Sequence, residues 1–267
     1  MSDEQTFLQF AQDLAHKAGA IMRDYLQVGV QQEIKSDGSP VTIADTKINQ
    51  MVIDAVQERY PAHSIISEEA NDIHKSGEYA WVCDPIDGTL PFTFGLPISL
   101  FSLALVKDGV PVLGILYDPY QDRMYSAVKG QGAYLNDRKL QVSQTASLAG
   151  NYMAIPGVKE KRFDSASFAK QVMQADIKTF TLVCVTAEAA LVASGQITAN
   201  VFGGQSPWDI AAAKIIVEEA GGKVTDLAGN EQRYDQPING AIISNGRVHD
   251  ELVACLQAYT VDTPDTP

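Results

Sequence analysis

Residues 81–94 read WVCDPIDGTLPFTF, a stretch in which an apolar run leads directly into two aspartates. Asp84 and Asp87 flank a Pro-Ile pair, and Gly88 and Thr89 follow at once. A strand that ends in an Asx-type turn accounts for these residues, because Asp, Pro, Gly and Thr are common in turns. The same residues could instead form a functional site. The stretch alone leaves both interpretations open, and the rest of the chain decides between them.

The composition is that of a soluble globular protein. The chain has 267 residues, of which 45% are hydrophobic and 20% charged, so it can bury a large core. The net charge of −13 argues against a nucleic acid or an anionic membrane as partner, and an anionic substrate would need cations to mediate its binding. No apolar run approaches the ~20 residues that span a bilayer. The acidic N-terminus lacks the basic region of a signal peptide, so we expect a cytoplasmic protein.

The periodicity of the apolar residues predicts both helices and strands. Helical spacing runs over about 7–26 and again over 43–59. Between about 63 and 137, period-two segments joined by Asp-Gly and Gly-rich turns predict the strands of an antiparallel or mixed sheet. After about 149, strands alternate with helices, which we expect at 161–174, 186–194, 207–220 and 247–258.

This pattern predicts an α/β fold of two sandwiched subdomains without a true linker. We expect an N-terminal α+β subdomain over 1–148 and a C-terminal α/β subdomain over 149–259. Residues 260–267 are rich in Pro and Thr, and we expect them to be a disordered tail.

Other carboxylates stand where a strand or a turn meets a loop or a helix. Glu68 and Glu69 follow a predicted strand, and a solvated charged turn would account for an isolated acidic pair. In residues 206–209, SPWD, the serine as N-cap, the proline at the first helical position and the aspartate form a capping-box variant. Thr42 and Asp45 begin another predicted helix in a similar way. Each of these carboxylates therefore has a structural explanation by itself.

Taken together, the acidic residues have a better explanation as one site. Glu68, Asp84, Asp87 and Asp209 could converge at one edge of a sheet, where their mutual repulsion would need compensation. Divalent cations supply it, and a ligand set of oxygens without His or Cys favours Mg²⁺ over zinc. The turn that begins at Gly88 offers backbone N–H groups to an anion. Metal ions beside such amides indicate phosphate chemistry.

The order and spacing of these motifs resemble the inositol monophosphatase family of Mg²⁺-dependent, lithium-sensitive phosphatases. The family pattern is an EE pair, then D-P-[IL]-D-G-T, then W-D at a helix start. The chain carries SEE at 67–69, DPIDGT at 84–89 and PWDIAA at 207–212. Weaker matches are VTxxD at 41–45, Gly95, GxLYDP at 114–119, GxGAYLN at 130–136 and EAGG at 219–222. The resemblance spans about residues 5–258.

The resemblance implies a five-layered α/β/α/β/α sandwich, usually a homodimer, that hydrolyses a small phosphorylated metabolite with a metal-activated water. It implies two or three Mg²⁺ ions per site, with Mn²⁺ as a substitute and Li⁺ and Ca²⁺ as inhibitors. The implied metal ligands are Glu68, Asp84, the carbonyl of Ile86, Asp87 and Asp209. The implied phosphate-binding residues are Asp87, Gly88 and Thr89. The implied catalytic residues are Thr89, Glu68, Asp45 and Lys35.

The chain departs from the family where the organic part of the substrate should lie. Many relatives read DGTTNF, but this chain has Leu90 and Pro91. Val185 lies in a segment where relatives carry a [GS]-[ST]-A-A sequence. Inositol-specific relatives place a glutamate seven residues before the aspartate of the W-D motif, and Phe202 occupies that position here. We expect these four residues to line a more apolar substrate pocket, unless Phe202 only packs in its strand.

Other functions remain open at this point. Related branches hydrolyse histidinol phosphate, fructose 1,6-bisphosphate or 3′-phosphoadenosine 5′-phosphate. A non-catalytic regulatory dimer on the same scaffold is a further alternative, although all four implied metal carboxylates are present.

Overall fold

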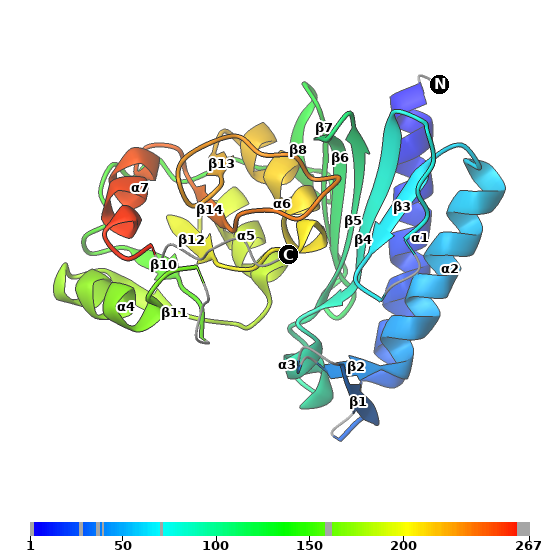
Figure 1. The fold of residues 1–267 in the computed structure, drawn as a ribbon, viewed down its shortest axis with the longest axis horizontal. Helices are drawn as coiled ribbons and strands as arrows, with labels where there is room; N and C mark the ends of the chain where they lie inside the picture. Colours follow the sequence, from blue (N-terminus) through cyan, green and yellow to red (C-terminus); the bar gives the residue numbers. More distant parts are fainter. Residues whose placement is uncertain are drawn as a thin grey trace.

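The computed structural model describes residues 3–26, 29–35, 38, 40–69, 72–157 and 162–260. Within them, two main sheets and three pairs of helices form five layers (Figure 1). The layers run helix pair, seven-stranded sheet, helix pair, five-stranded sheet and helix pair. The predicted α/β/α/β/α sandwich is confirmed.

The larger sheet carries the WVCDPIDGT stretch on its second strand. The strand order is β3-β4-β5-β6-β7-β8-β9, with β3 and β4 parallel and all other neighbours antiparallel. Residues 80–87 of β4 are buried without alternation, since helices cover both faces of the sheet. The bounds are β3 (Ser64–Ser67), β4 (Tyr79–Asp87), β5 (Leu100–Lys107), β6 (Val110–Asp118), β7 (Arg123–Val128), β8 (Gly132–Leu135) and β9 (Arg138–Lys139).

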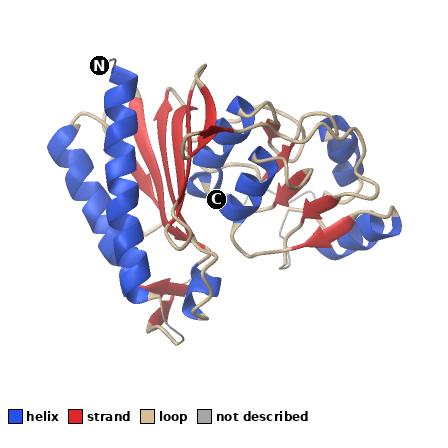
Figure 2. Cartoon of the chain, turned by 180° about the vertical axis from the view of Figure 1, so that it is seen from behind, coloured by secondary structure: helices blue, strands red, loops and turns tan. Residues whose placement is uncertain are grey.

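Two long helices cover the outer face of this sheet, as Figures 1 and 2 show from opposite sides. They are α1 (Asp3–Tyr25) and α2 (Ile43–Arg59), and both match the predicted helices. Helix α1 approaches the sheet closely at Gly19, where an added Cβ would lie 2.4 Å from the ring of Tyr117. Helix α2 begins with the predicted capping box. The Thr42 hydroxyl accepts from the Asp45 amide, and the Asp45 carboxylate accepts from the Thr42 amide.

The second sheet has the strand order β11-β10-β12-β14-β13 and is mixed. Strand β10 runs parallel to β11 and β12, whereas β14 runs antiparallel to β12 and β13. Helices α4 (Ser165–Gln174) and α7 (His249–Gln257) cover its outer face. The strand bounds are β10 (Tyr152–Ala154), β11 (Lys178–Phe180), β12 (Ala199–Phe202), β13 (Lys223–Thr225) and β14 (Ala241–Ser244).

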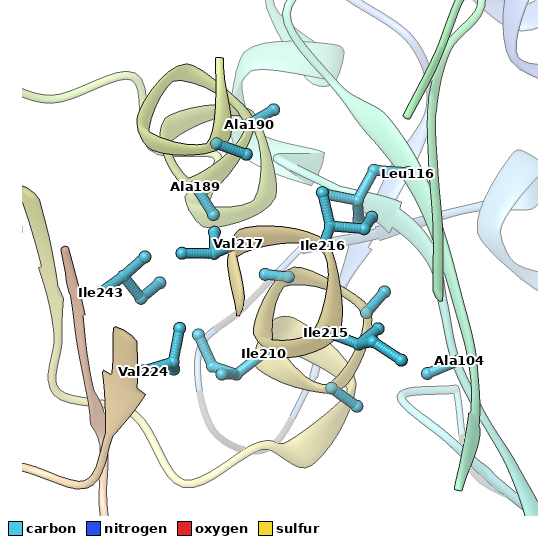
Figure 3. Close-up of a cluster of buried hydrophobic side chains, with 14 of the residues drawn as sticks. Ala104, Leu116, Ala189, Ala190, Ile210, Ile215, Ile216, Val217, Val224 and Ile243 are labelled. Atoms are coloured by element: carbon cyan, nitrogen blue, oxygen red, sulfur yellow. The ribbon is translucent and has the colours of Figure 1, made fainter. Parts of the chain in front are cut away.

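Helices α5 (Val185–Ala193) and α6 (Pro207–Glu219) form the middle layer. Helix α6 contacts both sheets and presents apolar side chains to each of them (Figure 3). Ile215 and Ile216 face Ala104 and Leu116 of the larger sheet. On the opposite side, Ile210 and Val217 face Val224 and Ile243 of the second sheet. One buried cluster therefore joins the two sheets and fixes the start of α6 relative to β4.

Several elements differ from the prediction. The structure adds a two-stranded sheet, β1 (Gln32–Ile34) with β2 (Pro40–Thr42), a short helix α3 (Thr89–Thr93), and strands β8, β9 and β13, of which β8 lies in a Gly-rich segment expected to be a turn. These elements are too short to give a periodic signal. The sequence KTFTLV at 178–183 predicts a strand as far as Val183, but strand β11 ends at Phe180. It ends early because the Leu182 amide bonds to a side chain of α5 and Val183 adopts a φ of +57°.

The boundary at 148/149 falls between the last strand of the larger sheet and the first strand of the second, and two subdomains remain our proposal. Of the predicted tail, Thr260 forms an isolated bridge with Phe163, and residues 261–267 lie outside the described part of the chain. Among the helices that the structure describes, none has the length and apolar character needed to cross a membrane.

Candidate metal centre

The fold brings three carboxylates together at one edge of the larger sheet. Asp84 and Asp87 lie at the carboxyl end of β4, and Asp209 lies in the first turn of α6. Each offers an oxygen atom, and these oxygens all lie within 4.8 Å of one another. The predicted capping box at Ser206 is wrong, because the Ser206 side chain makes no capping hydrogen bond. Asp209 belongs instead to the acidic cluster.

The DPIDGT turn places these groups through a break in the strand ladder. The pairing of β4 with β5 shifts register between Asp84 and Asp87, and the Ile86 amide donates to Asp84 Oδ1 at 3.0 Å. Gly88 then adopts a φ of +83°, which favours glycine. A Cβ on Gly88 would also lie 2.9 Å from Cys184 Cβ. The motif needs glycine for its backbone and for the close approach of the loop before α5.

Burial and mutual repulsion dominate the electrostatics of the cluster. Asp84 is 1% exposed and Asp87 8%. Burial, and then the neighbouring carboxylates, raise the pKa of Asp84 and Asp209 well above the ordinary value. Burial also raises the pKa of Asp87, although hydrogen bonds from Thr186 oppose the rise. Two buried carboxylates and a half-buried one this close together are unfavourable without a cation, and a set of oxygen donors fits a hard divalent ion. This cluster could therefore hold a metal ion.

Asp87 receives donors from the start of α5 that the sequence did not reveal. Thr186 donates to Asp87 Oδ2 from its amide at 2.6 Å and from its hydroxyl at 2.5 Å. The Cys184 thiol lies 3.3 Å from the same oxygen. Both residues lie in the segment that departs from the [GS]-[ST]-A-A sequence of relatives. This sequence difference was the one indication that the segment has a special role. Thr186 supplies the hydroxyl that holds Asp87 in place.

Glu68 lies outside the three-carboxylate cluster and pairs with a lysine. It follows β3, and the parallel pairing of β3 with β4 brings it to the same sheet edge. Lys35 Nζ lies 2.8 Å from Glu68 Oε1 and 2.7 Å from Glu69 Oε1. Burial acts to lower the pKa of Lys35, but the two glutamates together outweigh burial and raise it. Burial also raises the pKa of Glu69 to about 7, a perturbation that the sequence did not indicate.

Thr89 and Asp45 meet behind the turn. The Thr89 hydroxyl lies 3.0 Å from the Ile86 carbonyl oxygen and 3.5 Å from Asp45 Oδ1. Asp45 is fully buried, and burial raises its pKa to about 6. The first turn of α2 thus carries a carboxylate that accepts from Thr42 through Oδ2 and faces the Thr89 hydroxyl with Oδ1.

A cavity of about 210 Å³ opens beside the cluster, and Asp87 and Asp209 form part of its wall. Two of the four predicted pocket residues, Val185 and Phe202, also line it. Leu90 and Pro91 are not among its lining residues, since both lie on α3. Glu188 of α5 lines the cavity as well, and no sequence motif pointed to it.

Comparisons with known proteins agree with this geometry. The profile of the inositol monophosphatase family matches residues 3–260. A fructose-1,6-bisphosphatase/inositol-1-monophosphatase from Thermotoga maritima is 35% identical over 219 residues, which cover 80% of each chain. Inositol monophosphatase 1 from Bos taurus is 31% identical over 269 residues, covering 94% of this chain and 93% of its own.

A solved structure of an IMPase from Thermotoga maritima has a TM-score of 0.85 at 32% identity and covers 95% of this chain and 97% of its own. Fold, motif order and sequence similarity over nearly the whole chain therefore lead to one conclusion. The chain belongs to the inositol monophosphatase family and is a phosphoric monoester hydrolase.

Proposed function

We propose that this protein is a Mg²⁺-dependent phosphomonoesterase that hydrolyses a small phosphorylated metabolite in the cytoplasm, as a homodimer. The observation that carries the proposal is the cluster of Asp84, Asp87 and Asp209 beside the amides of Gly88 and Thr89. Bound cations would keep these crowded carboxylates ionised, and a phosphate ester brings the negative charge that bound cations attract.

Each residue has a role that follows from its position. Asp84, Asp87, Asp209 and the Ile86 carbonyl would hold the cations. Glu68 would join them through Oε2, because its ion pair with Lys35 uses Oε1. The bound ions would neutralise charge on the phosphoryl oxygens and acidify water. Gly88 and Thr89 would donate their amides to the phosphate.

Thr89, Asp45 and Lys35 complete the proposed machinery. The Thr89 hydroxyl would orient the attacking water, and Asp45 would accept the proton that this hydroxyl shares. A carboxyl with a pKa of about 6 is suited to this task near neutral pH, because it both accepts and releases a proton there. Lys35 would hold Glu68 at the rim of the site through their 2.8 Å ion pair.

The pocket supports a substrate other than inositol 1-phosphate as the preferred one. Phe202 offers no hydrogen bond to a hydroxyl, and Val185 adds a second apolar wall. Without the glutamate of inositol-specific relatives at this position, the pocket loses an acceptor for a polyol hydroxyl and favours a polyol phosphate less over other phosphate esters. We infer a broad or altered preference among small phosphomonoesters, with Mn²⁺ able to replace Mg²⁺ and with Li⁺ and Ca²⁺ inhibitory.

Hydrolysis of an aryl phosphate by the wild-type protein and by Asp87→Asn tests the proposal. Wild type should require Mg²⁺, and the variant should lose about 100-fold or more in kcat, because Asp87 faces both the other acids and the substrate pocket. Asp137→Asn removes the same charge at an exposed position and should behave as wild type. Full Mg²⁺-dependent turnover by Asp87→Asn would overturn the metal assignment.

A panel of inositol, glycerol, fructose, histidinol and adenosine phosphates tests the substrate preference. A lead of about a hundredfold in kcat/KM for inositol 1-phosphate would contradict the role given to Phe202.

A further inference from the structure

A cavity of about 600 Å³ lies at the end of the larger sheet that is remote from the acidic cluster. Strand β4 runs from this cavity at Tyr79 to the cluster at Asp87, roughly 25 Å away at the usual rise of a strand. The cavity is larger than the 210 Å³ cavity beside the cluster, and its volume falls in the range of small-molecule sites. No step of the proposed hydrolysis uses it.

Three neighbouring strands build the floor of this cavity. Leu105 of β5 pairs with Leu113 of β6, and Leu113 pairs with Val128 of β7, so the three side chains form one row across the sheet. All three are buried in the cluster that the sheet shares with α1 and α2. A β-bulge lies beside the row, because the pairing of β5 with β6 skips Val112. Val112 lines the cavity together with Leu113, which adjacent residues of a regular strand would not do.

Aromatic side chains from α1 and β4 form the walls. Phe7 lies in the second turn of α1, and its ring centroid is 5.7 Å from that of Tyr79. Glu4 lies one turn earlier on the same face of the helix and also lines the cavity. Its Oε2 accepts a hydrogen bond from Gln131 Nε2 at 2.8 Å. The body of a ligand in this space would therefore contact leucine, valine and aromatic side chains.

Two lysines lie on either side of β6 at this cavity. Lys107 ends β5 and Lys129 follows β7, so their backbones are on the order of 10 Å apart, about two strand spacings. Lys107 Nζ lies 3.4 Å from Glu78 Oε2, in a half-exposed ion pair, and 5.3 Å from the centroid of the Tyr79 ring. Within the part of the chain that the structure describes, Lys129 makes no ion pair. An ammonium group has three donors, so Lys107 can bind an anion while it keeps Glu78.

We propose that this cavity binds a small organic anion, a carboxylate on an aryl or branched alkyl body. The apolar row of the sheet would bury the body, and Lys107 and Lys129 would bind the carboxylate at the solvent end, since both lysines are partly exposed. The lining carries two lysines against one glutamate, although the whole chain has a net charge of −13. A neutral ligand of the same shape would leave the lysines unused, and an inorganic anion would leave the apolar floor unused.

A purely structural role accounts for only part of this arrangement. The stem of Lys107 can cover apolar surface while its charge stays in water, and the ion pair with Glu78 agrees with that role. That role does not account for Lys129 on the other side of β6. It also leaves a space of about 600 Å³ between the start of α1 and the sheet, where a helix and a sheet normally pack closely.

Isothermal titration calorimetry with 4-phenylbutyrate tests the proposal, with 4-phenylbutan-1-ol and acetate as comparison ligands. All titrations contain chelator, so that no cation at the acidic cluster can bind the carboxylate. Wild type should bind 4-phenylbutyrate with a dissociation constant of about 1 mM or below. It should bind the alcohol at least about fivefold more weakly, because the alcohol cannot pair with the lysines, and acetate more weakly still.

Three variants locate the binding site. The double variant Lys107→Gln, Lys129→Gln should bind the carboxylate at least about fivefold more weakly than wild type and the alcohol equally well. Val112→Trp should weaken the binding of both ligands, because the larger side chain fills the cavity. Lys17→Gln changes an exposed lysine of α1 that does not line the cavity and should bind both ligands as wild type does. Urea unfolding of each variant shows whether it is folded under these conditions.

Three outcomes would overturn the proposal. The first is no binding of 4-phenylbutyrate to wild type up to about 10 mM. The second is equal affinity for the carboxylate and the alcohol, which would exclude recognition of the charge. The third is unchanged carboxylate binding in the folded double variant, which would place the site elsewhere. Because neither metal nor phosphate ester is present, none of these results decides whether the acidic cluster catalyses hydrolysis.

Discussion

Glu188 should make the free energy of unfolding fall as the pH rises. Its carboxyl is 5% exposed, and burial, with a further contribution from Asp87, raises its pKa from 4.5 to about 7. A carboxyl whose pKa is raised in the folded protein holds its proton more tightly there than in the unfolded chain. The contribution of Glu188 to the free energy of unfolding is therefore most favourable below pH 4.5, falls between pH 4.5 and 7, and levels off above that window.

The magnitude follows from this pKa difference. A rise from 4.5 to about 7 corresponds to about 3 kcal/mol at pH 8, since each pKa unit is about 1.4 kcal/mol. At pH 5 most of the folded protein carries the proton, and the penalty is about 1 kcal/mol. Glu188→Gln keeps an acceptor for Leu182 and removes the ionisation. The variant should therefore be more stable than wild type by about 1 kcal/mol at pH 5 and about 3 kcal/mol at pH 8.

Urea unfolding at several pH values measures this difference. Chelator should be present throughout, so that metal binding does not change with pH. Glu58→Gln serves as the control, because Glu58 is exposed on α2 and a solvated charge contributes little. A stability difference between Glu188→Gln and wild type that stays constant from pH 5 to 8 would refute the reasoning. If the gain appears, the native glutamate lowers stability, which is common for residues kept for binding.

Three further predictions concern the turn and the metals. Gly88→Ala should lower the free energy of unfolding by at least about 1 kcal/mol, because alanine is strained at a φ of +83° and its Cβ would crowd Cys184. An unchanged free energy of unfolding in urea would contradict this prediction. Thr89→Val should reduce kcat by about 100-fold while Thr89→Ser keeps most activity, and steady-state kinetics showing equal activity for both would exclude a role for the hydroxyl. Li⁺ should inhibit uncompetitively with respect to substrate, and no inhibition at tens of millimolar would show a departure from the family at the second cation position.

The sequence was most informative where the site is local in the chain. Asp84, Asp87 and Gly88 could be identified because they lie in one turn, where their spacing in the sequence determines how they are placed in space. Asp209 could be added because the family pattern places a W-D motif at a helix start, and the chain carries this motif at 208–209. The apolar periodicity likewise predicted α1, α2 and the main strands, since each is long enough to show a repeat.

The remaining site residues depend on contacts between distant parts of the chain. Thr186 donates to Asp87 across 99 positions, and nothing near Thr186 in the sequence announces that bond. Lys35 follows β1 and Glu68 follows β3, and the two side chains pair across 33 positions of the chain. Glu188 lies in an apolar helix, where a single polar residue suggests solvent exposure. Packing of α5 against β12 buries it.

The central claim is that the Asp84–Asp87–Asp209 cluster binds divalent cations, and Mg²⁺-dependent stability tests it directly. Urea unfolding of wild type, Asp84→Asn and the exposed control Asp137→Asn should be followed from chelator to high Mg²⁺. Wild type and the control should gain about 1.4 kcal/mol per tenfold rise in free Mg²⁺ above the dissociation constant, for each ion bound. Asp84→Asn should be more stable than wild type in chelator, because one repelling charge is gone, and should gain far less with Mg²⁺. Equal Mg²⁺ responses in wild type and Asp84→Asn, or no response in either, would contradict the account.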